Sequence, residues 1–372
     1  MNRDAIYGKV LGCLVGGLIG DAMGAPVEGW PYERIVAEKG YIDNFEGGGT
    51  DDSAIKLILC EALIKNGGHV TADDFAESFL NHKDDYGLFF VPVRNMFHKI
   101  QDELTLPVEA GRDNTASSSS AMSIAPIGVV NACDPRTAAA EAYEAAGLIH
   151  SGCSSFCRDG ASAVAAAIAE AFRPGATVDT VLDAAVAFLH KKSAAAMRAR
   201  IGETLALART SAGTGGTICG GCGGAGDVSG SDGNGRAGYL NFRKRYYETV
   251  HLYNTICDSR ETVPVALAVF LLAGGDASHA VEYGANFGRD ADTIATMAGA
   301  IAGAYAGIGG FRRHWANKAL GKNTWDIKSP GIKTQGSPDP GFEEKLAEDM
   351  TDLLIKRYNE KASVLSYLDA IC

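Results

Sequence analysis

Residues 290–307 of this 372-residue chain read DADTIATMAGAIAGAYAG, a stretch of small and apolar residues that follows two aspartates. Its periodicity predicts a helix over Asp292 to Ala306. Gly299, Gly303 and Gly307 recur at every fourth position, so they share one face of that helix. A face without side chains lets a second backbone approach closely, and we therefore predict tight helix packing at the centre of a helical bundle.

The rest of the chain shows the same helical pattern. Apolar residues recur at three- and four-residue spacing, and a sustained alternation of apolar and polar residues is found almost nowhere. The sequence therefore predicts an all-α fold. Besides the helix just described, we expect helices over Asp4–Met23, Ser53–Lys65, Asp73–Leu80, Val91–Gln101, Ser119–Val130, Pro135–Leu148, Ser155–Phe172, Val178–Lys191, Ala194–Ala208, Tyr239–Thr255, Thr262–Leu272, Ala277–Tyr283 and Gly341–Tyr358.

Two stretches interrupt the helical pattern. Residues 213–238 are rich in glycine and too long for an ordinary connection, so we expect a mobile loop or lid there. Residues 321–340 contain three prolines and indicate a surface connection to the last helix. The chain length leaves two domains open. We favour one helical domain over residues 1–372, with a C-terminal extension from about residue 321, because half of the acidic site described below lies between the two stretches.

The composition is that of a globular protein, with 46% hydrophobic and 21% charged residues. A net charge of -11 argues against nonspecific binding to nucleic acid or to an anionic membrane, because both are themselves negatively charged. A divalent cation is a better partner for such a chain. The nine cysteines are an odd number spread over a long chain, which favours reduced thiols and a cytoplasmic location.

Two apolar runs allow a membrane or export interpretation. Residues 10–19 resemble the apolar part of a signal peptide, and residues 293–311 are long enough to cross a bilayer. The first run contains several glycines and is followed by Asp21, and the second consists mainly of alanine and glycine. We therefore interpret both runs as packed helices of the core.

A first acidic cluster follows three glycines, in the order Thr50-Asp51-Asp52-Ser53, and opens a predicted helix. Carboxylates and a threonine at a helix start are typical of N-terminal capping, and this interpretation explains the cluster when it is taken alone. Magnesium requires about six hard oxygen ligands, and these must converge from several segments of a chain. One such cluster would be too few.

A second acidic cluster makes the metal interpretation stronger. Asp290-Ala291-Asp292-Thr293 again places two carboxylates and a threonine at the start of a helix. Two acidic helix starts that face each other repel strongly unless a cation lies between them. We therefore predict that the two clusters converge around divalent cations.

Three motifs together resemble the signatures of the ADP-ribosylglycohydrolase family, which includes the dinitrogenase reductase-activating glycohydrolases. These motifs are Gly20-Asp21 with Glu28, then Thr50-Asp51-Asp52-Ser53, then Asp290-Ala291-Asp292-Thr293. They occur in the family's order and span the chain from about Leu11 to Ala306. The resemblance implies an all-α orthogonal bundle and a hydrolase that cleaves the C1 glycosidic bond of an ADP-ribosyl group.

The resemblance also implies a site. It implies a binuclear centre of two Mg²⁺ or Mn²⁺ ions, with the ligands Thr50, Asp51, Asp52, Asp290, Asp292 and Thr293. Among the acidic residues, catalytic roles fall to Glu28, Asp51 and Asp292, with Glu28 acting as a base or a gate. The segment 114–122 is similar to the family's phosphate and ribose loop, which implies the substrate-binding residues Thr115, Ser117, Ser118, Ser119, Ser120 and His150.

One difference from the family keeps a second hypothesis open. Family members carry a Gly-Asn-Gly stretch where this chain has Ser117 to Ser120, and glycines are what allow backbone amides to approach a diphosphate closely. An N-ribosyl hydrolase that acts on a smaller, nucleoside-like substrate is therefore an alternative, and so is a non-catalytic ligand-binding member of the fold. The expected partner is an ADP-ribosylated or ribosyl-containing molecule, and the oligomeric state stays open.

Overall fold

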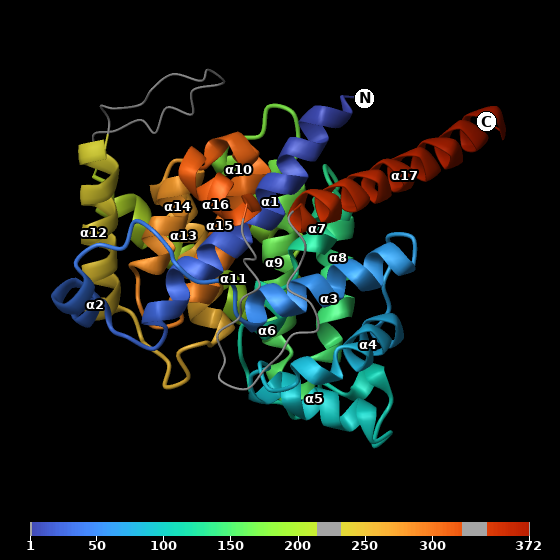
Figure 1. Ribbon diagram of the computed structural model, residues 1–372, viewed down its shortest axis with the longest axis horizontal. Helices are drawn as coiled ribbons and strands as arrows, with labels where there is room; N and C mark the ends of the chain where they lie inside the picture. Colours follow the sequence, from blue (N-terminus) through green and yellow to red (C-terminus); the bar gives the residue numbers. More distant parts are fainter. Residues whose placement is uncertain (1, 214–231, 322–340, 372) are drawn as a thin grey trace.

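The computed structural model describes residues 2–213, 232–321 and 341–371, and it shows a bundle of helices (Figure 1). None of these residues lies in a β-strand, and backbone pairing of the β type is limited to two isolated bridges, Pro31 with Gly288 and Arg112 with Ser151. The predicted all-α fold is therefore confirmed.

The helices vary widely in length, and several are joined by short 3₁₀ turns. The first half of the chain forms α1 (Arg3–Gly24), α2 (Tyr32–Lys39), α3 (Asp51–Lys65), α4 (Ala72–Asn81), α5 (Val91–Gln101), α6 (Ser119–Met122), α7 (Ala125–Val130), α8 (Pro135–Ala145) and α9 (Phe156–Ala171). The second half forms α10 (Val178–Ala187), α11 (Ala195–Ser211), α12 (Asp232–Thr249), α13 (Ser259–Leu272), α14 (Ala277–Ala285), α15 (Ala291–Ala306), α16 (Arg313–Gly321) and α17 (Phe342–Ile371).

Two differences from the predicted helices have a local cause. The helix expected over Ser119–Val130 divides into α6 and α7, because Pro126 lacks the N–H that a continuous helix needs and its ring clashes with the preceding turn. The short helices α2 and α16 were not predicted. Each is only eight or nine residues long and has at most three buried residues, so its apolar pattern extends over too few positions to predict a helix.

The predicted end of the glycine-rich loop, at residue 238, was wrong. Residues 232–238 belong to helix α12, and the rest of that loop, from residue 214, lies outside the described residues. The same helix ends at Thr249, six residues before the predicted end at Thr255. The residues that follow are irregular, and they form part of the cavity described below.

The centre of the bundle is the contact between α1 and α15, which lie side by side (Figure 1). Glycines of both helices meet there, so the close packing predicted for the glycines of α15 is confirmed, with α1 as a partner that was not predicted. A Cβ atom at Gly16 would lie 2.3 Å from the carbonyl oxygen of Gly299, and a Cβ atom at Gly24 would lie 2.3 Å from the backbone nitrogen of Asp292. Only glycine permits this approach, which brings the end of α1 against the start of α15.

Burial identifies α1 as a core helix. Within the described chain, one segment is long and apolar enough to cross a membrane by length and composition, Arg3–Val27, and 89% of its apolar window is buried inside the structure. Residues from Val10 to Gly24 are all buried, and α1 is covered mainly by α15, with further contacts from α17 and α14. The packed-helix interpretation of this run accounts for that burial.

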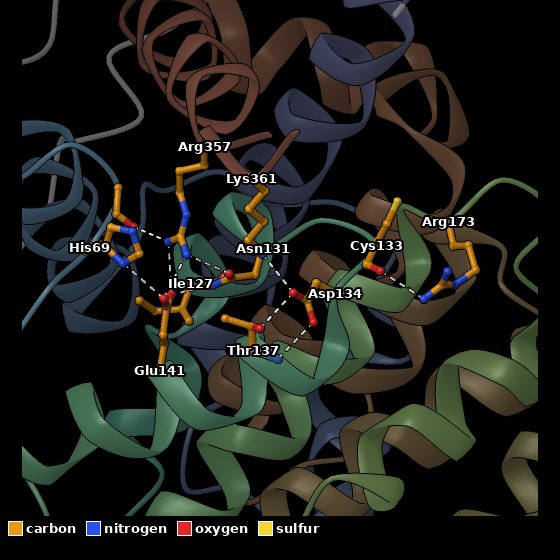
Figure 2. A network of polar contacts seen from close by, with 11 residues as sticks. His69, Ile127, Asn131, Cys133, Asp134, Thr137, Glu141, Arg173, Arg357 and Lys361 are labelled. Carbon is orange, nitrogen blue, oxygen red and sulfur yellow. Dashed lines mark hydrogen bonds and ion pairs between the residues drawn. The ribbon is translucent and has the colours of Figure 1, made fainter. Parts of the chain in front are cut away.

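The C-terminal helix α17 is fixed to the bundle by a network of paired charges (Figure 2). Arg357 is 3% exposed and donates to the carboxylate of Glu141 over 2.8 and 3.0 Å and to the amide oxygen of Asn131 over 3.0 Å. It also donates to the backbone carbonyl of Gly68. Beyond this point the helix projects away from the body of the molecule (Figure 1).

Candidate metal and active site

Asp21, near the end of α1, organises the first acidic cluster. It is fully buried, and its carboxylate accepts hydrogen bonds from the backbone N–H and hydroxyl of Thr50, at 2.8 and 2.9 Å, and from the same groups of Ser53, at 3.0 and 2.6 Å. These four bonds fix the start of α3 against the end of α1. The periodicity of the sequence does not predict that Asp21 organises this cluster. Only the resemblance to the ADP-ribosylglycohydrolase motifs indicated that Asp21 belongs to the site.

Capping explains only part of the first cluster. Thr50 is the N-cap residue of α3, and its hydroxyl accepts from the backbone N–H of Asp52 while it donates its own proton to Asp21. Asp51 accepts from the backbone N–H of Phe90 at 3.3 Å. Asp52 is 2% exposed, and its Oδ1 atom has no hydrogen-bond partner among the described residues. The buried carboxylate of Asp52 therefore has an oxygen that can still accept a hydrogen bond or bind a cation, and capping of α3 does not use it.

The second cluster lies beside the first, as predicted. Asp290 occupies the N-cap position of α15 but makes no side-chain capping bond, and it accepts instead from the hydroxyl of Ser118 at 2.8 Å. Asp292 is buried, and its Oδ1 atom also lacks a partner in the described part of the chain. The hydroxyl of Thr293 donates to Asp52 over 3.4 Å, which joins the two helix starts directly.

Glu28 reaches this site through backbone pairing. The N–H of Gly29 donates to the carbonyl of Arg289 and the N–H of Arg289 donates to the carbonyl of Trp30, both at 2.7 Å. This pairing places Glu28 beside the second cluster, so that one carboxylate oxygen each from Glu28, Asp290 and Asp292 lie within 4.8 Å of one another.

Arg289 makes that pairing possible at some cost in backbone energy. Its φ of 59° lies in the left-handed region, which a residue with a side chain seldom adopts. The fully buried Glu261 accepts from its guanidinium, and the same group donates to the backbone carbonyl of Tyr253. This buried ion pair holds Arg289 in place, and sequence reasoning gave neither of its members this role.

The electrostatics of the site are those of crowded, buried carboxylates. Burial raises the pKa of Asp51 and of Asp290 to about 7, with further contributions from neighbouring acids. Burial and the surrounding carboxylates raise the pKa of Asp52 and of Asp292 well above the ordinary value, and burial raises the pKa of Glu28. Divalent cations would offset this repulsion and would give a partner to the buried Oδ1 atoms of Asp52 and Asp292. The residues present therefore fit a magnesium or manganese site.

The acidic groups lie in a cavity of about 460 Å³, a size typical of ligand sites. Predicted site residues that line it are Glu28, Asp51, Asp52, Ser118, Ser119, Asp290, Asp292 and Thr293. Residues that were not predicted complete the wall, namely Leu88, Phe89, Phe90, Val91, Arg94, Met122, Asn254, Thr255, Ile256 and Cys257.

The remaining predicted residues do not line the cavity. His150 is fully buried, and its two ring nitrogens are hydrogen-bonded to the hydroxyls of Ser117, at 3.1 Å, and of Ser120, at 3.0 Å. Burial lowers the pKa of His150 to about 3, so the ring is neutral. Thr115 is exposed, and neither it nor Thr50 is part of the wall. Within the serine segment, the wall is therefore formed by Ser118 and Ser119.

Comparison with known proteins identifies the family. The family model for ADP-ribosylglycohydrolase matches residues 2–353. The chain belongs to the ADP-ribosylglycohydrolase family. It is similar to a protein of Escherichia coli (strain K12) called "Uncharacterized protein YegU", with 27% identity over 324 residues that cover 81% of this chain and 88% of that protein.

A solved structure shares the fold. The chain matches one described as an "ADP-ribosylglycohydrolase-related protein complex", with a TM-score of 0.62, 21% identity and coverage of 94% of this chain and 99% of the other. As a member of the ADP-ribosylglycohydrolase family, the protein is a glycosidic-bond hydrolase. The family acts on ADP-ribosylated or ribosyl-containing substrates and is generally metal-dependent.

Proposed function

We propose that this protein hydrolyses the C1 glycosidic bond of an ADP-ribosyl group at a centre of two Mg²⁺ or Mn²⁺ ions. The observation that carries this proposal is the convergence of Asp52 and Asp292 in one cavity, each with a buried carboxylate oxygen that has no partner among the described residues. Buried carboxylates without partners are costly, and cations are the ligands that relieve this cost.

The ligands in this proposal are Thr50, Asp51, Asp52, Asp290, Asp292 and Thr293. Thr50 and Thr293 each donate the hydroxyl proton to an aspartate, at 2.9 and 3.4 Å. The Thr50 oxygen also accepts from the backbone N–H of Asp52, so it keeps one lone pair for a cation, whereas the Thr293 oxygen keeps two. When bound, such ions supply Lewis-acid polarisation of substrate oxygens.

The side chains of the chain itself have separate tasks in the reaction. Cleavage at C1 passes through an oxocarbenium-like state, whose positive charge is stabilised by the surrounding carboxylates. Glu28 lies on an exposed turn at the edge of the cluster, where it can accept a proton from the attacking water. Asp51 and Asp292 are the alternative acceptors. Ser118 holds the carboxylate of Asp290 through its hydroxyl.

A second candidate function is hydrolysis of a smaller, nucleoside-like N-riboside. The observation in its favour is that the side chains of Ser118 and Ser119 line the cavity where family members have a glycine-rich segment. Side chains at these positions limit how closely a diphosphate can approach the backbone. The cytoplasmic location expected from the cysteine content stays a prediction.

One experiment tests both candidates. Wild-type protein, Asp292→Ala and the exposed control Asp183→Ala are incubated with Mg²⁺ and a panel of ADP-ribosylated peptides and purine and pyrimidine nucleosides. Release of ADP-ribose by the wild type and by the control, but not by Asp292→Ala, supports the first proposal. Release of ribose from nucleosides alone supports the second. Absence of both products from a wild-type protein that binds Mg²⁺ contradicts both.

A further inference from the structure

Arg94 is the one basic side chain in the wall of the acidic cavity, as far as the described residues show. It lies on the first turn of α5, where its backbone N–H donates to the carbonyl of Phe90 at 2.9 Å. The N–H of Phe90 in turn donates to Asp51. Arg94 therefore lies one helical turn after Phe90, the residue that contacts the predicted metal ligand Asp51.

The guanidinium of Arg94 has unused capacity. One terminal nitrogen donates to the backbone carbonyl of Gly87 at 2.6 Å, whereas the buried Nε atom has no hydrogen-bond partner in the described part of the chain. Five carboxylates line the same cavity, yet no ion pair of Arg94 with a described residue is found. The guanidinium carbon lies 5.7 Å from the centre of the Tyr86 ring, which is a weak cation–π contact. A guanidinium has five N–H donors, so several donors and much of the charge are left for a ligand.

The wall next to Arg94 favours a strong interaction with an anion. The residues that precede it, Leu88 to Val91, are apolar and line the same cavity. Apolar surroundings strengthen the attraction between opposite charges, because they lower the local dielectric constant. The planar fork of arginine also matches the oxygens of a phosphate, which can accept two parallel hydrogen bonds from it.

We propose that Arg94 binds a phosphate group of the substrate and so determines specificity for phosphorylated ribosyl compounds. The inference rests on the proposed function, in which the acidic cluster holds the ribose. In this arrangement, a side-chain contact from α5 takes the place of the backbone contact that the serines at positions 117–120 disfavour. A neutral nucleoside lacks the group that Arg94 binds, so the inference favours an ADP-ribosyl substrate over a nucleoside.

The test measures binding of three ligands in the presence of Mg²⁺ by isothermal titration. The ligands are ADP-ribose, ribose 5-phosphate and ribose, the last measured by competition. The proteins are the wild type, Arg94→Gln, Arg94→Lys and the exposed control Arg313→Gln. Hydrogen bonds to charged groups are worth enough that Arg94→Gln should weaken binding of ADP-ribose about tenfold to a hundredfold. Arg94→Lys should recover part of this loss, because it restores the charge without the fork.

The pattern across ligands separates the outcomes. An equal loss for ADP-ribose and ribose 5-phosphate, with ribose and the control unchanged, assigns Arg94 to the phosphate next to the ribose. A loss for ADP-ribose alone assigns it to the distal phosphate. Unchanged affinity for both phosphorylated ligands overturns the inference. So does an equal loss for all three ligands with a lower melting temperature, because Arg94 would then only support the turn at Gly87.

Failure of the proposed function gives a different result from failure of the role of Arg94. A wild-type protein that binds Mg²⁺ but none of the three ligands contradicts the proposed function, and the inference with it. If the wild type binds ADP-ribose and Arg94→Gln binds it equally tightly, the inference about Arg94 is contradicted and the proposed function is not.

Discussion

The contact between α17 and α8 and the cavity between α3 and α15 both bury charged side chains, but only the first pairs them. Arg357 shares its guanidinium among Glu141, Asn131 and a backbone carbonyl (Figure 2). In the cavity, Asp52 and Asp292 are about as well buried, at 2% and 3% exposure, and each keeps an oxygen without a partner in the described chain.

The pKa shifts of the two regions have opposite signs. Hydrogen bonds and the charge of Arg357 hold the pKa of Glu141 below its ordinary value, although burial acts against them. Burial and neighbouring acids raise the pKa of Asp52 and of Asp292. The first region therefore gains stability from its charges, whereas the second loses stability, which the proposed cations would restore. Unsatisfied charge concentrated in one cavity is typical of a functional site.

Substitution of a cavity aspartate should have the largest effect. We expect Asp52→Asn to reduce turnover of an ADP-ribosylated peptide on the order of 10²- to 10³-fold, because it removes charge that stabilises both cation and transition state. The metal-free variant should melt no lower than the wild type, since a repulsive charge is lost. Calorimetric Mn²⁺ titration and thermal melts check this. A clearly lower melting temperature of metal-free Asp52→Asn than of the metal-free wild type would mean that the charge of Asp52 stabilises the fold.

Substitution of Arg357 should show the reverse pattern. We expect Arg357→Met to lower the free energy of unfolding by about 3 kcal/mol, because it removes the guanidinium from Glu141 and leaves that largely buried carboxylate with only Asn131 and His69 as partners. Urea denaturation measures this change. The exposed pair of Lys65 and Glu77 provides the control, and Lys65→Met should have little effect. Turnover per folded molecule should stay within about twofold of wild type, and a larger loss would contradict the separation of roles.

The metal cluster shows how much of the site the sequence predicts. Each half of the cluster is a local motif at a helix start, and both helices are rich in apolar residues and buried over most of their length. Their convergence was predicted from the repulsion between two acidic helix starts. In the structure it depends on Asp21 of α1, which holds the start of α3, and on the close packing of α1 against α15. Glycine spacing predicted close packing on the face of Gly299, but it did not predict that α1 is the partner helix.

Other parts of the site were not predictable from such patterns. The position of Glu28 depends on a left-handed Arg289 and on its pairing with Glu261, and no local rule predicts a positive φ for arginine. Arg94 lies in a helix that was predicted with the right bounds, but the packing of α5 decides that it faces the cavity. The roles of Ser117 and Ser120 depend on a distant histidine in the same way.

The smallest effect concerns pH, and its sign differs between the two regions. In the metal-free protein, the folded-state pKa of Asp51 and of Asp290 is raised to about 7, above that of the unfolded chain. The folded state then binds more protons, so stability falls as pH rises from about 4 to about 7. Glu141 has a lowered pKa, so its contribution is present above its unfolded value of 4.5 and is lost as pH falls below it.

Melting curves with and without saturating Mg²⁺ separate these contributions. Cations require ionised ligands, so the increase in melting temperature caused by Mg²⁺ should grow between pH 6 and pH 8, where the folded-state pKa values of about 7 lie. In Asp52→Asn the Mg²⁺-dependent increase should be largely lost across this range, while Arg357→Met should retain it on a lower baseline. An increase that is the same at both pH values would show that cations bind without displacing protons, and the raised pKa values of the cavity would then have no part in metal binding.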